Sequence, residues 1–404
     1  MPQAEPINQN GLSVCPNCGA GGLADIYEVR GIPVHSTLNL PTAEAAVNYP
    51  RGDLALAFCA TCGFLCNRLF DPTVHEYCPQ CEESQAFSPT FNAFARGLAQ
   101  RWVQRYGVRN KTIVEIGCGK ADFLMLICEA GDNRGIGIDP SARPDRIPPE
   151  HRGRIRLIRE LYGPQHACLQ ADVLLCRHTL EHIAQTRDFL AGIRRTIGAR
   201  RDTLVLFELP DVARVLREGA FWDIYYEHCS YFSAGSLARL FRSTGFEVVE
   251  LERDYADQYL LLAAYPADGP TRPRLPLEDD LAQIADLARG ARERFPRMIG
   301  HWRGALAELR AQGAQPVVWG ALSKGVSFLT TLGLGADQVP YVVDINPHRQ
   351  GSYMAGTGQR IINPQGLRGV PRPAIVAMNP IYCDEIRRQL RSVGVEARVL
   401  PVVA

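Results

Sequence analysis

The chain has 404 residues, a formal net charge of +1 at pH 7, 46% hydrophobic residues and 22% charged residues. This is the composition of an ordinary globular protein, long enough for two or three domains. A near-neutral surface has no overall attraction for nucleic acid or an anionic membrane, and no apolar run is long enough to cross a bilayer. The N-terminus lacks the basic start and apolar core of a secretory signal, and the 13 cysteines are an odd number scattered along the chain. We therefore expect a cytoplasmic protein that binds neither nucleic acid nor membrane, with cysteines that serve a metal site rather than disulfides.

The first predicted domain, residues 1–75, carries two Cys-x-x-Cys-Gly turns. Each turn presents two thiolates, and two such turns supply the tetrahedral four-sulfur set that zinc favours. The expected ligands of a structural Zn²⁺ are Cys15, Cys18, Cys59 and Cys62. Four thiolates leave no open position for a catalytic metal, although they do not by themselves separate zinc from iron. The pair Cys78 and Cys81 lacks the trailing glycine, and we interpret it as a bystander.

The second predicted domain, residues 76–268, alternates strand and helix patterns. A buried strand at 112–117 runs into a glycine turn and a helix, and a second strand at 134–139 ends in an acid. Further strands are expected at 155–159, 172–176, 203–208, 247–251 and 259–264, the last two antiparallel after a helix at 236–243. Seven strands in this rhythm predict an α/β fold with a doubly wound sheet and a ligand site at the carboxyl ends of its strands.

The glycine turn of this domain differs from a dinucleotide-binding fingerprint because an acid, Glu115, lies inside the strand before it. An acid there can face the ammonium group of S-adenosylmethionine, while Gly117 and Gly119 let the backbone approach the ligand closely. Asp139 ends the next strand, where a carboxylate can accept both hydroxyl groups of a ribose. The pattern favours S-adenosylmethionine as the cofactor over NAD, which Glu115 and the two-glycine turn disfavour.

Two histidines, His178 and His182, follow the strand at 172–176. Lying four residues apart, they can ligate a metal from one face of a helix. We expect instead that His178 lies at a helix start beside the cofactor and that His182 is only packed.

A loop with the sequence Tyr-Tyr-Glu-His, residues 225–228, follows the strand at 203–208, at the edge where such folds perform their chemistry. Tyr225, Glu227 and His228 can supply a phenol donor, an orienting carboxylate and a general base. The alternative is that this aromatic-rich loop only fills a gap in the packing.

The third predicted domain, residues 269–404, opens with a proline-rich linker and a long helix at about 277–312. A second nucleotide-type unit follows, with a strand at 317–320 and a turn at 321–325, so we expect a Rossmann-like α/β domain. Lys324 in that turn, and Asn379 after a later strand, can face a diphosphate. The alternative is a turn that only opens a helix, with a solvated lysine.

Together these motifs resemble the three-domain C-methyltransferase family that acts on nucleotide-linked 4-keto deoxysugars. The likeness covers nearly the whole chain and includes the paired cysteine turns, residues 115–119, the Tyr-x-Glu-His loop with 231–233, and third-domain motifs at 320–321, 324–325, 344–347, 350–351 and 379–380. The resemblance implies a small zinc-binding N-terminal domain, a central class I methyltransferase domain, and a C-terminal domain that helps to hold the substrate. It also implies that His228 is the catalytic base, with Tyr225 and Glu227 as its companions.

The chain departs from this family in three places. Tyr226 stands where the family usually has His, and residues 257–259 replace a Gly-Gly-Ser sequence. The third departure is the segment 77–84, in which Tyr77 is expected to contact the substrate and Cys81 lies near a position often held by Tyr. Because the last two regions face the substrate in the family, the identity of the sugar stays open.

The expected chemistry is carbon methylation, which requires that a proton first leave the carbon beside a ketone. His228, kept neutral and oriented by Glu227, would remove this proton, and Tyr225 would donate a hydrogen bond to the enolate oxygen. Three other functions are weighed against it: methylation of an activated carbon that is not part of a sugar, methylation of RNA, and binding without catalysis. Near-neutral charge disfavours RNA as the substrate, and the intact glycine turn disfavours a protein that has lost its cofactor site.

Overall fold

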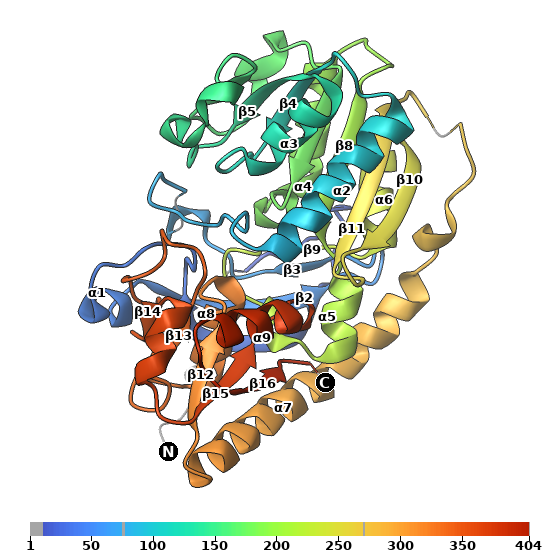
Figure 1. Cartoon of the computed structure of the whole chain (residues 1–404). Helices are drawn as coiled ribbons and strands as arrows, with labels where there is room; N and C mark the ends of the chain where they lie inside the picture. The colour runs from blue at the N-terminus through green and yellow to red at the C-terminus, as the bar shows by residue number, and fades with distance from the viewer. Residues whose placement is uncertain (1–10, 75–76, 270, 404) are drawn as a thin grey trace.

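The computed structural model describes residues 11–74, 77–269 and 271–403. In the view of Figure 1 the central sheet lies at the top, the N-terminal strands lie across the middle and the C-terminal sheet lies at the bottom. The predicted boundary between the first two domains, at residues 75 and 76, falls outside the described residues, as do residues 1–10 of the first domain. Within the described ranges, every helix is too short or too polar to cross a membrane.

The N-terminal sheet is antiparallel, with the strand order β1-β2-β3-β9. Its elements are β1 (Ala24–Pro33), helix α1 (Ala43–Val47), β2 (Arg51–Phe58), β3 (Leu65–Asn67) and β9 (Ser230–Tyr231). Leu65 pairs with Tyr231 and Cys66 pairs with Ser230, so the last strand is the segment that directly follows His228. The Tyr-Tyr-Glu-His loop of the second domain is therefore held by the sheet of the first.

The central sheet has seven strands in the order β10-β11-β8-β7-β4-β5-β6. All neighbouring pairs from β8 to β6 are parallel, and β11 is antiparallel to both β8 and β10. The strands are β4 (Thr112–Ile116), β5 (Arg134–Ile138), β6 (Ile155–Ile158), β7 (Val173–Arg177), β8 (Leu204–Pro210), β10 (Phe246–Asp254) and β11 (Tyr259–Pro266). The doubly wound sheet and the antiparallel final pair, and with them the class I methyltransferase fold, are confirmed.

Alternating apolar residues along the central strands supply two cores, one on each face of the sheet. Leu175 packs with helices α2 and α3, whereas its neighbour Leu174 packs with helices α4 and α6. The helices are α2 (Pro89–Tyr106), α3 (Asp122–Gly131), α4 (Thr186–Ile197), α5 (Val212–Glu218) and α6 (Ala234–Ser243). The chain order reverses direction between β4 and β7, and the crevice for a ligand opens at such a point, at the carboxyl ends of the strands.

The C-terminal sheet has five parallel strands in the order β14-β13-β12-β15-β16, as expected of a Rossmann-like domain. Its elements are β12 (Gln315–Trp319), β13 (Tyr341–Val343), β14 (Arg360–Ile362), β15 (Pro373–Ala377), β16 (Arg398–Pro401), and helices α7 (Leu281–Ala311), α8 (Ser323–Leu332) and α9 (Cys383–Ser392). The long helix begins four residues later than predicted, because residues Pro276–Glu278 form a 3₁₀ turn.

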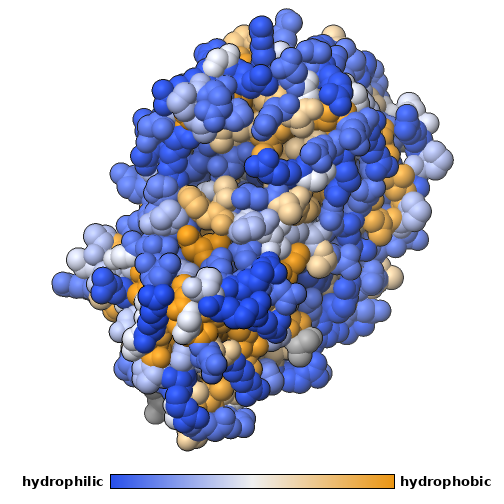
Figure 2. All heavy atoms as spheres, in the orientation of Figure 1, coloured by the Kyte–Doolittle hydropathy of each residue, from blue (hydrophilic) through white to orange (hydrophobic). Residues whose placement is uncertain are grey.

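One hydrophobic core runs through all three sequence regions. It joins Leu54 of β2, Phe221 after α5, Phe295 of α7 and Phe328 of α8, all of which are buried. On the face shown in Figure 2, hydrophilic side chains cover most of the surface around the central sheet, and apolar ones gather towards the C-terminal sheet. The order of the sheets follows the predicted domains, but the packing does not separate the first region from the third.

Candidate functional site

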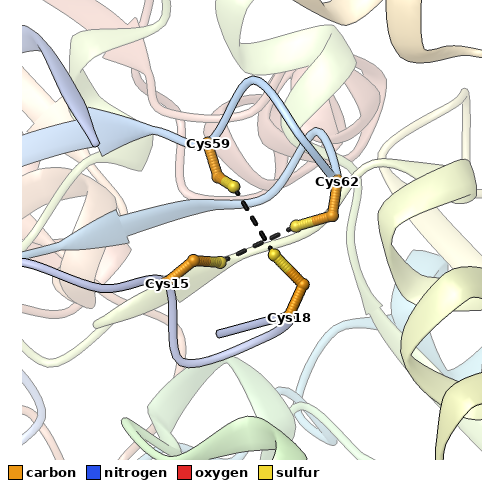
Figure 3. Close-up of side chains that lie close together, drawn as sticks. All are labelled: Cys15, Cys18, Cys59 and Cys62. Carbon is orange, nitrogen blue, oxygen red and sulfur yellow. Dashed lines mark hydrogen bonds between the residues drawn. The ribbon is translucent and has the colours of Figure 1, made fainter. Parts of the chain in front are cut away.

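The four cysteines of the paired turns converge on one point (Figure 3). The Sγ atoms of Cys15 and Cys62 lie 3.7 Å apart, and so do those of Cys18 and Cys59. In each turn the glycine adopts a positive φ, 80° at Gly19 and 74° at Gly63, which lets its N–H reach back to the first cysteine carbonyl. The sequence therefore placed all four sulfurs correctly.

The spacing of these sulfurs matches a zinc ion. Four sulfurs placed about 2.3 Å from a central ion at tetrahedral corners lie about 3.8 Å from one another. The Asn17 side chain donates to Cys62 Sγ and accepts a hydrogen bond from Thr186, which ties this turn to the central domain. Cys78 and Cys81 lie outside this cluster, consistent with their interpretation as bystanders.

The glycine turn after β4 has a backbone that only glycine accommodates well. Gly117 and Gly119 have φ values of 69° and 53°. A Cβ at Gly117 would overlap the Thr179 hydroxyl, and one at Gly119 would overlap the Glu83 carboxylate. The turn is thus a tightly packed cradle, in which the Gly117 N–H donates to the Ile138 carbonyl and the Gly119 N–H donates to Asp139.

Glu115 lies at the base of this cradle and is 2% exposed. Its Oε2 atom has no hydrogen-bond partner among the described residues. Burial raises the pKa of Glu115 to about 8, although the Arg177 charge opposes this shift. A buried acceptor without a donor is costly unless a ligand supplies one, so Glu115 fits the ammonium group of S-adenosylmethionine.

Asp139, at the end of β5, closes the other side of the cradle. Its Oδ2 accepts from the Gly119 N–H at 2.8 Å, and its Oδ1 accepts from the Ser141 N–H at 2.6 Å. Together, the orphaned carboxylate, the glycine cradle and this acid fit the methionyl and ribose parts of S-adenosylmethionine.

The segment 77–88 crosses the cradle, which the sequence did not predict. Lys120 is almost fully buried and donates to Glu83 at 3.0 Å and to the Cys81 carbonyl at 2.8 Å. In the same segment Glu82 pairs with Arg146 of the central domain and accepts from Asn346 of the C-terminal domain. This segment therefore links the central and C-terminal domains.

His178 follows β7 with a positive φ of 47° and precedes a 3₁₀ turn, Leu180–His182, instead of the α-helix expected. Its Nε2 lies 3.0 Å from Glu208 Oε1. Burial lowers the pKa of His178, but the charges of Glu208 and Glu181 outweigh burial and raise it to about 9. His178 is therefore a cation at pH 7, placed against the Tyr259 ring with 4.6 Å between centroids.

The Tyr-Tyr-Glu-His loop places His228 beside Tyr225, with 3.0 Å between the Tyr225 hydroxyl and His228 Nε2. His228 is 6% exposed. Burial, with lesser contributions from His182, His178 and Lys324, lowers its pKa well below the ordinary value, so the imidazole is neutral at pH 7. A neutral ring can accept a proton, as the sequence predicted for the base.

His182 belongs to the same cluster, and besides being packed there it makes polar contacts. Its ring centroid lies 4.7 Å from that of His228. Its Nδ1 lies 2.6 Å from the Tyr77 hydroxyl and 3.0 Å from the Glu227 carbonyl oxygen. Tyr77, expected to contact the substrate, therefore reaches the predicted base through His182.

Glu227 has a different partner from the one expected. Its Oε1 accepts hydrogen bonds from the backbone N–H and the hydroxyl of Ser36, and Ser36 in turn contacts Ser323 of α8 at 2.6 Å. Burial raises the pKa of Glu227 to about 7, and the hydrogen bonds from Ser36 oppose that rise. The loop thus joins the N-terminal and C-terminal domains at this carboxylate, and no hydrogen bond to His228 is found among the described residues.

Lys324 and Asn379 both face the central domain. The Lys324 ammonium group forms an ion pair with Asp223, three positions before Tyr226. Asn379 and Gln258 exchange two side-chain hydrogen bonds of 3.2 and 2.8 Å. The carboxyl edge of the C-terminal sheet therefore lies against the Tyr-Tyr-Glu-His loop and the turn between β10 and β11.

Comparison with known proteins supports this picture. Residues 91–251 match the family described as "Methyltransferase domain", and residues 288–399 match "C-methyltransferase C-terminal domain". C-methyltransferase NovU of Streptomyces niveus is 28% identical over 290 residues, which cover 68% of this chain and 68% of that protein.

Two solved methyltransferase structures overlap part of this chain. The 1,6-didemethyltoxoflavin-N1-methyltransferase of Burkholderia thailandensis is 19% identical, covers 43% of this chain and 79% of that chain, and gives a TM-score of 0.33. Magnesium protoporphyrin IX methyltransferase of Synechocystis PCC 6803 is 11% identical, covers 44% and 84%, and gives a TM-score of 0.34. Scores this low add nothing to the strand order described above.

The strand order and the cradle define a class I methyltransferase, an enzyme that transfers a methyl group from S-adenosylmethionine. The family match extends this assignment past the central domain and into the C-terminal sheet. The chain matches the C-methyltransferase family in both of these domains and in its likeness to NovU.

Proposed function

We propose that this enzyme methylates the carbon beside the ketone of a nucleotide-linked deoxysugar, with His228 as the base that forms the enolate. The observation that carries the proposal is the buried, neutral His228 beside Tyr225 at the carboxyl edge of the central sheet. An oxygen or nitrogen atom can attack the methyl group with its own lone pair, whereas a carbon atom must first lose a proton. A buried imidazole with a phenol partner suits that task.

The proton transfer can be written with the groups present. A substrate carbonyl takes the Tyr225 hydroxyl as its hydrogen-bond donor, which leaves the lone pair of His228 Nε2 free. Nε2 removes the proton on the adjacent carbon, and the electron pair of the C–H bond moves into the carbonyl, where Tyr225 stabilises the oxyanion. When bound, S-adenosylmethionine supplies an electrophilic methyl group at its sulfonium sulfur for this carbon.

The cofactor would be held by Glu115, Gly117, Gly119 and Asp139, with His178 beside it. Burial of the loop between three sheets excludes water, so the enolate is protected from reprotonation by solvent. Positioning then supplies much of the remaining rate.

The sugar and its carrier would lie between the central and C-terminal sheets. Tyr77 is placed to contact the sugar beside His182, and Lys324 and Asn379 lie at the carboxyl edge of the C-terminal sheet, where a nucleotide is bound in such folds. Both would exchange their present partners, Asp223 and Gln258, for groups of the substrate.

The four-cysteine site would hold a structural Zn²⁺, and the chain would divide functionally at 1–75, 76–268 and 269–404. Support for zinc comes from the closed set of four sulfurs, which leaves no position for a reacting group. In this scheme the first region fixes the catalytic loop through β9, the second binds the cofactor and the third binds the nucleotide.

The test has two steps. Calorimetric titration with thymidine, uridine, cytidine and guanosine diphosphates, with S-adenosylhomocysteine present, should reveal one that binds. The keto sugar on that carrier should then exchange its carbon-bound proton with deuterated water, and His228→Gln should abolish the exchange while retaining S-adenosylhomocysteine binding. If none of the four binds, the substrate is a ketone without a nucleotide carrier, and exchange by His228→Gln at the wild-type rate would remove the base from this proposal.

A further inference from the structure

We propose that Glu181 is a positioning residue for the base: its carboxylate supports His228 when that ring carries the substrate proton. Glu181 takes the role that the sequence assigned to Glu227. This inference rests on the proposed function, because it concerns how the same proton is held after it leaves carbon.

The first observation is a three-residue cluster. One carboxylate oxygen of Glu181 and one ring nitrogen each of His182 and His228 all lie within 4.8 Å of one another. Glu181 is brought there by the 3₁₀ turn Leu180–His182 after β7, and Cys229, the residue that follows His228, donates to the Glu181 carbonyl. The turn and the loop are therefore fixed to each other.

The second observation is an unpaired buried oxygen. Glu181 is 2% exposed, and its Oε2 has no hydrogen-bond partner among the described residues. Its Oε1 lies 3.5 Å from His178 Nδ1, so the side chain is held on one side only. An unsatisfied buried carboxylate oxygen costs free energy that evolution tolerates where the group has a task.

The third observation is a cavity of about 20 Å³ between Glu181 and His228. Its other polar walls are Asp223, Ser230 and Tyr231, and the remaining walls are Pro210, Val212 and Val215. A cavity of this size and polarity accommodates one water molecule, which can bridge groups that lie too far apart for a direct hydrogen bond.

These observations answer a difficulty in the chemistry. A ring that is buried among other cations holds a proton weakly, and a weak base removes a proton from carbon slowly. Glu227 binds Ser36 through Oε1, and its Oε2 is also without a partner among the described residues. Unlike Glu181, however, Glu227 is not part of the cluster with His182 and His228. Glu181 offers a negative charge within 4.8 Å of the ring, which stabilises the imidazolium.

The proton balance is then complete. The C–H electron pair stays on the substrate as the enolate, and a new N–H bond forms on His228. After the methylated product leaves, the imidazolium gives its proton to solvent, which restores the neutral base.

Other charged or titratable groups also face His228. They must be the same residues in every variant whose pH dependence is compared. They are Tyr77 from the segment 77–88, His178 and His182 from the residues after β7, Asp223, Tyr225, Glu227 and Tyr231 from the catalytic loop and its flanks, and Lys324 from α8.

The first test needs no substrate. Nuclear magnetic resonance of isotope-labelled imidazole rings, in the complex with S-adenosylhomocysteine, follows the titration of His228 in wild type and in Glu181→Gln. We expect the pKa of His228 to be lower in the variant, because the ring loses a negative charge beside it. Glu160→Gln removes a carboxylate that pairs with His166 away from the site, and it should leave the pKa of His228 unchanged. An unchanged His228 titration in Glu181→Gln would overturn the inference.

The second test separates this inference from the proposed function. With the keto sugar as substrate, Glu181→Gln should slow deuterium exchange roughly tenfold or more and move the acid limb of the pH profile to lower pH. Glu181→Asp should restore part of the rate, and affinity for S-adenosylhomocysteine should not change. Exchange that fails in His228→Gln but is normal in Glu181→Gln would sink only this inference, whereas normal exchange in both would sink the proposed base as well.

Discussion

Cofactor binding should release a proton from Glu115, and the Glu115→Gln variant isolates this effect. Burial raises the pKa of the free carboxyl group to about 8, so it is mostly protonated at pH 7. An ammonium group beside Oε2 favours the ionised form and lowers that pKa in the complex. Because the pKa falls on binding, the affinity must rise with pH up to about 8.

The magnitude follows from the position of the pKa. At pH 7 a group with a pKa of about 8 is roughly nine-tenths protonated, so binding releases close to one proton. Between pH 6 and 7.5 the affinity should rise roughly twentyfold from this group alone. The upper limit is kept below pH 8 because the ligand's own amino group begins to lose its proton there.

Calorimetric titration with S-adenosylhomocysteine in phosphate and in Tris measures the released proton, because the two buffers differ in ionisation enthalpy. Wild type should release close to one proton more than Glu115→Gln, and the variant should bind roughly tenfold or more weakly at pH 7.5 because it lacks a charged hydrogen bond. Equal proton release in the two proteins would refute the assignment of Oε2 to the ammonium group, since Glu83 and His228 titrate in both.

Three other changes test the site. Cys62→Ser should lose its bound metal, measured by elemental analysis, and most of its activity. Structural zinc contributes about 10–16 kcal/mol of binding free energy, and the Cys62 turn leads into the strand that holds the His228 loop. A metal-free variant of full activity would contradict this coupling. His178→Gln should lower the free energy of unfolding by up to about 3 kcal/mol at pH 6, measured in urea, and the difference should fade above pH 9. The sign follows because the folded pKa of His178, about 9, exceeds the unfolded value of about 6.5, so the stabilisation is complete below the unfolded value and is lost through the folded one; a difference independent of pH would disprove the charged pair with Glu208. Tyr225→Phe should slow substrate deuterium exchange about 100-fold with unchanged S-adenosylhomocysteine affinity, and an unchanged rate would rule out Tyr225 as the oxyanion donor.

The features that local sequence predicts well are those built from short, regular patterns. The strands around Glu115 and Asp139 alternate with helices at the expected spacing, and the two cysteine turns each carry a glycine whose positive φ the turn requires. Such patterns are set by neighbours in the chain, so the doubly wound sheet, its antiparallel last pair and the four clustered sulfurs are all as predicted.

The features that were missed depend on pairings between distant residues. Glu227 lies 191 residues from Ser36, and Lys324 lies 101 residues from Asp223, so no local pattern announces either contact. The two-residue strand β9 is too short for a periodic signal. Glu181 adjoins His182 in the sequence, but only the fold shows that both face His228.

The continuous core of β2, α7 and α8 constrains how this enzyme can change its substrate over evolutionary time. A nucleotide-binding region that folded alone could be exchanged for another, as modules are in many multidomain enzymes. Here Leu54 of the N-terminal sheet and Phe328 of the C-terminal region are buried in the same core. Replacing the C-terminal region would therefore expose an apolar face on the strands that support the catalytic loop. New specificity is therefore expected to arise by point changes along the pocket, at positions such as Tyr77 and Gln258, with all three regions inherited together.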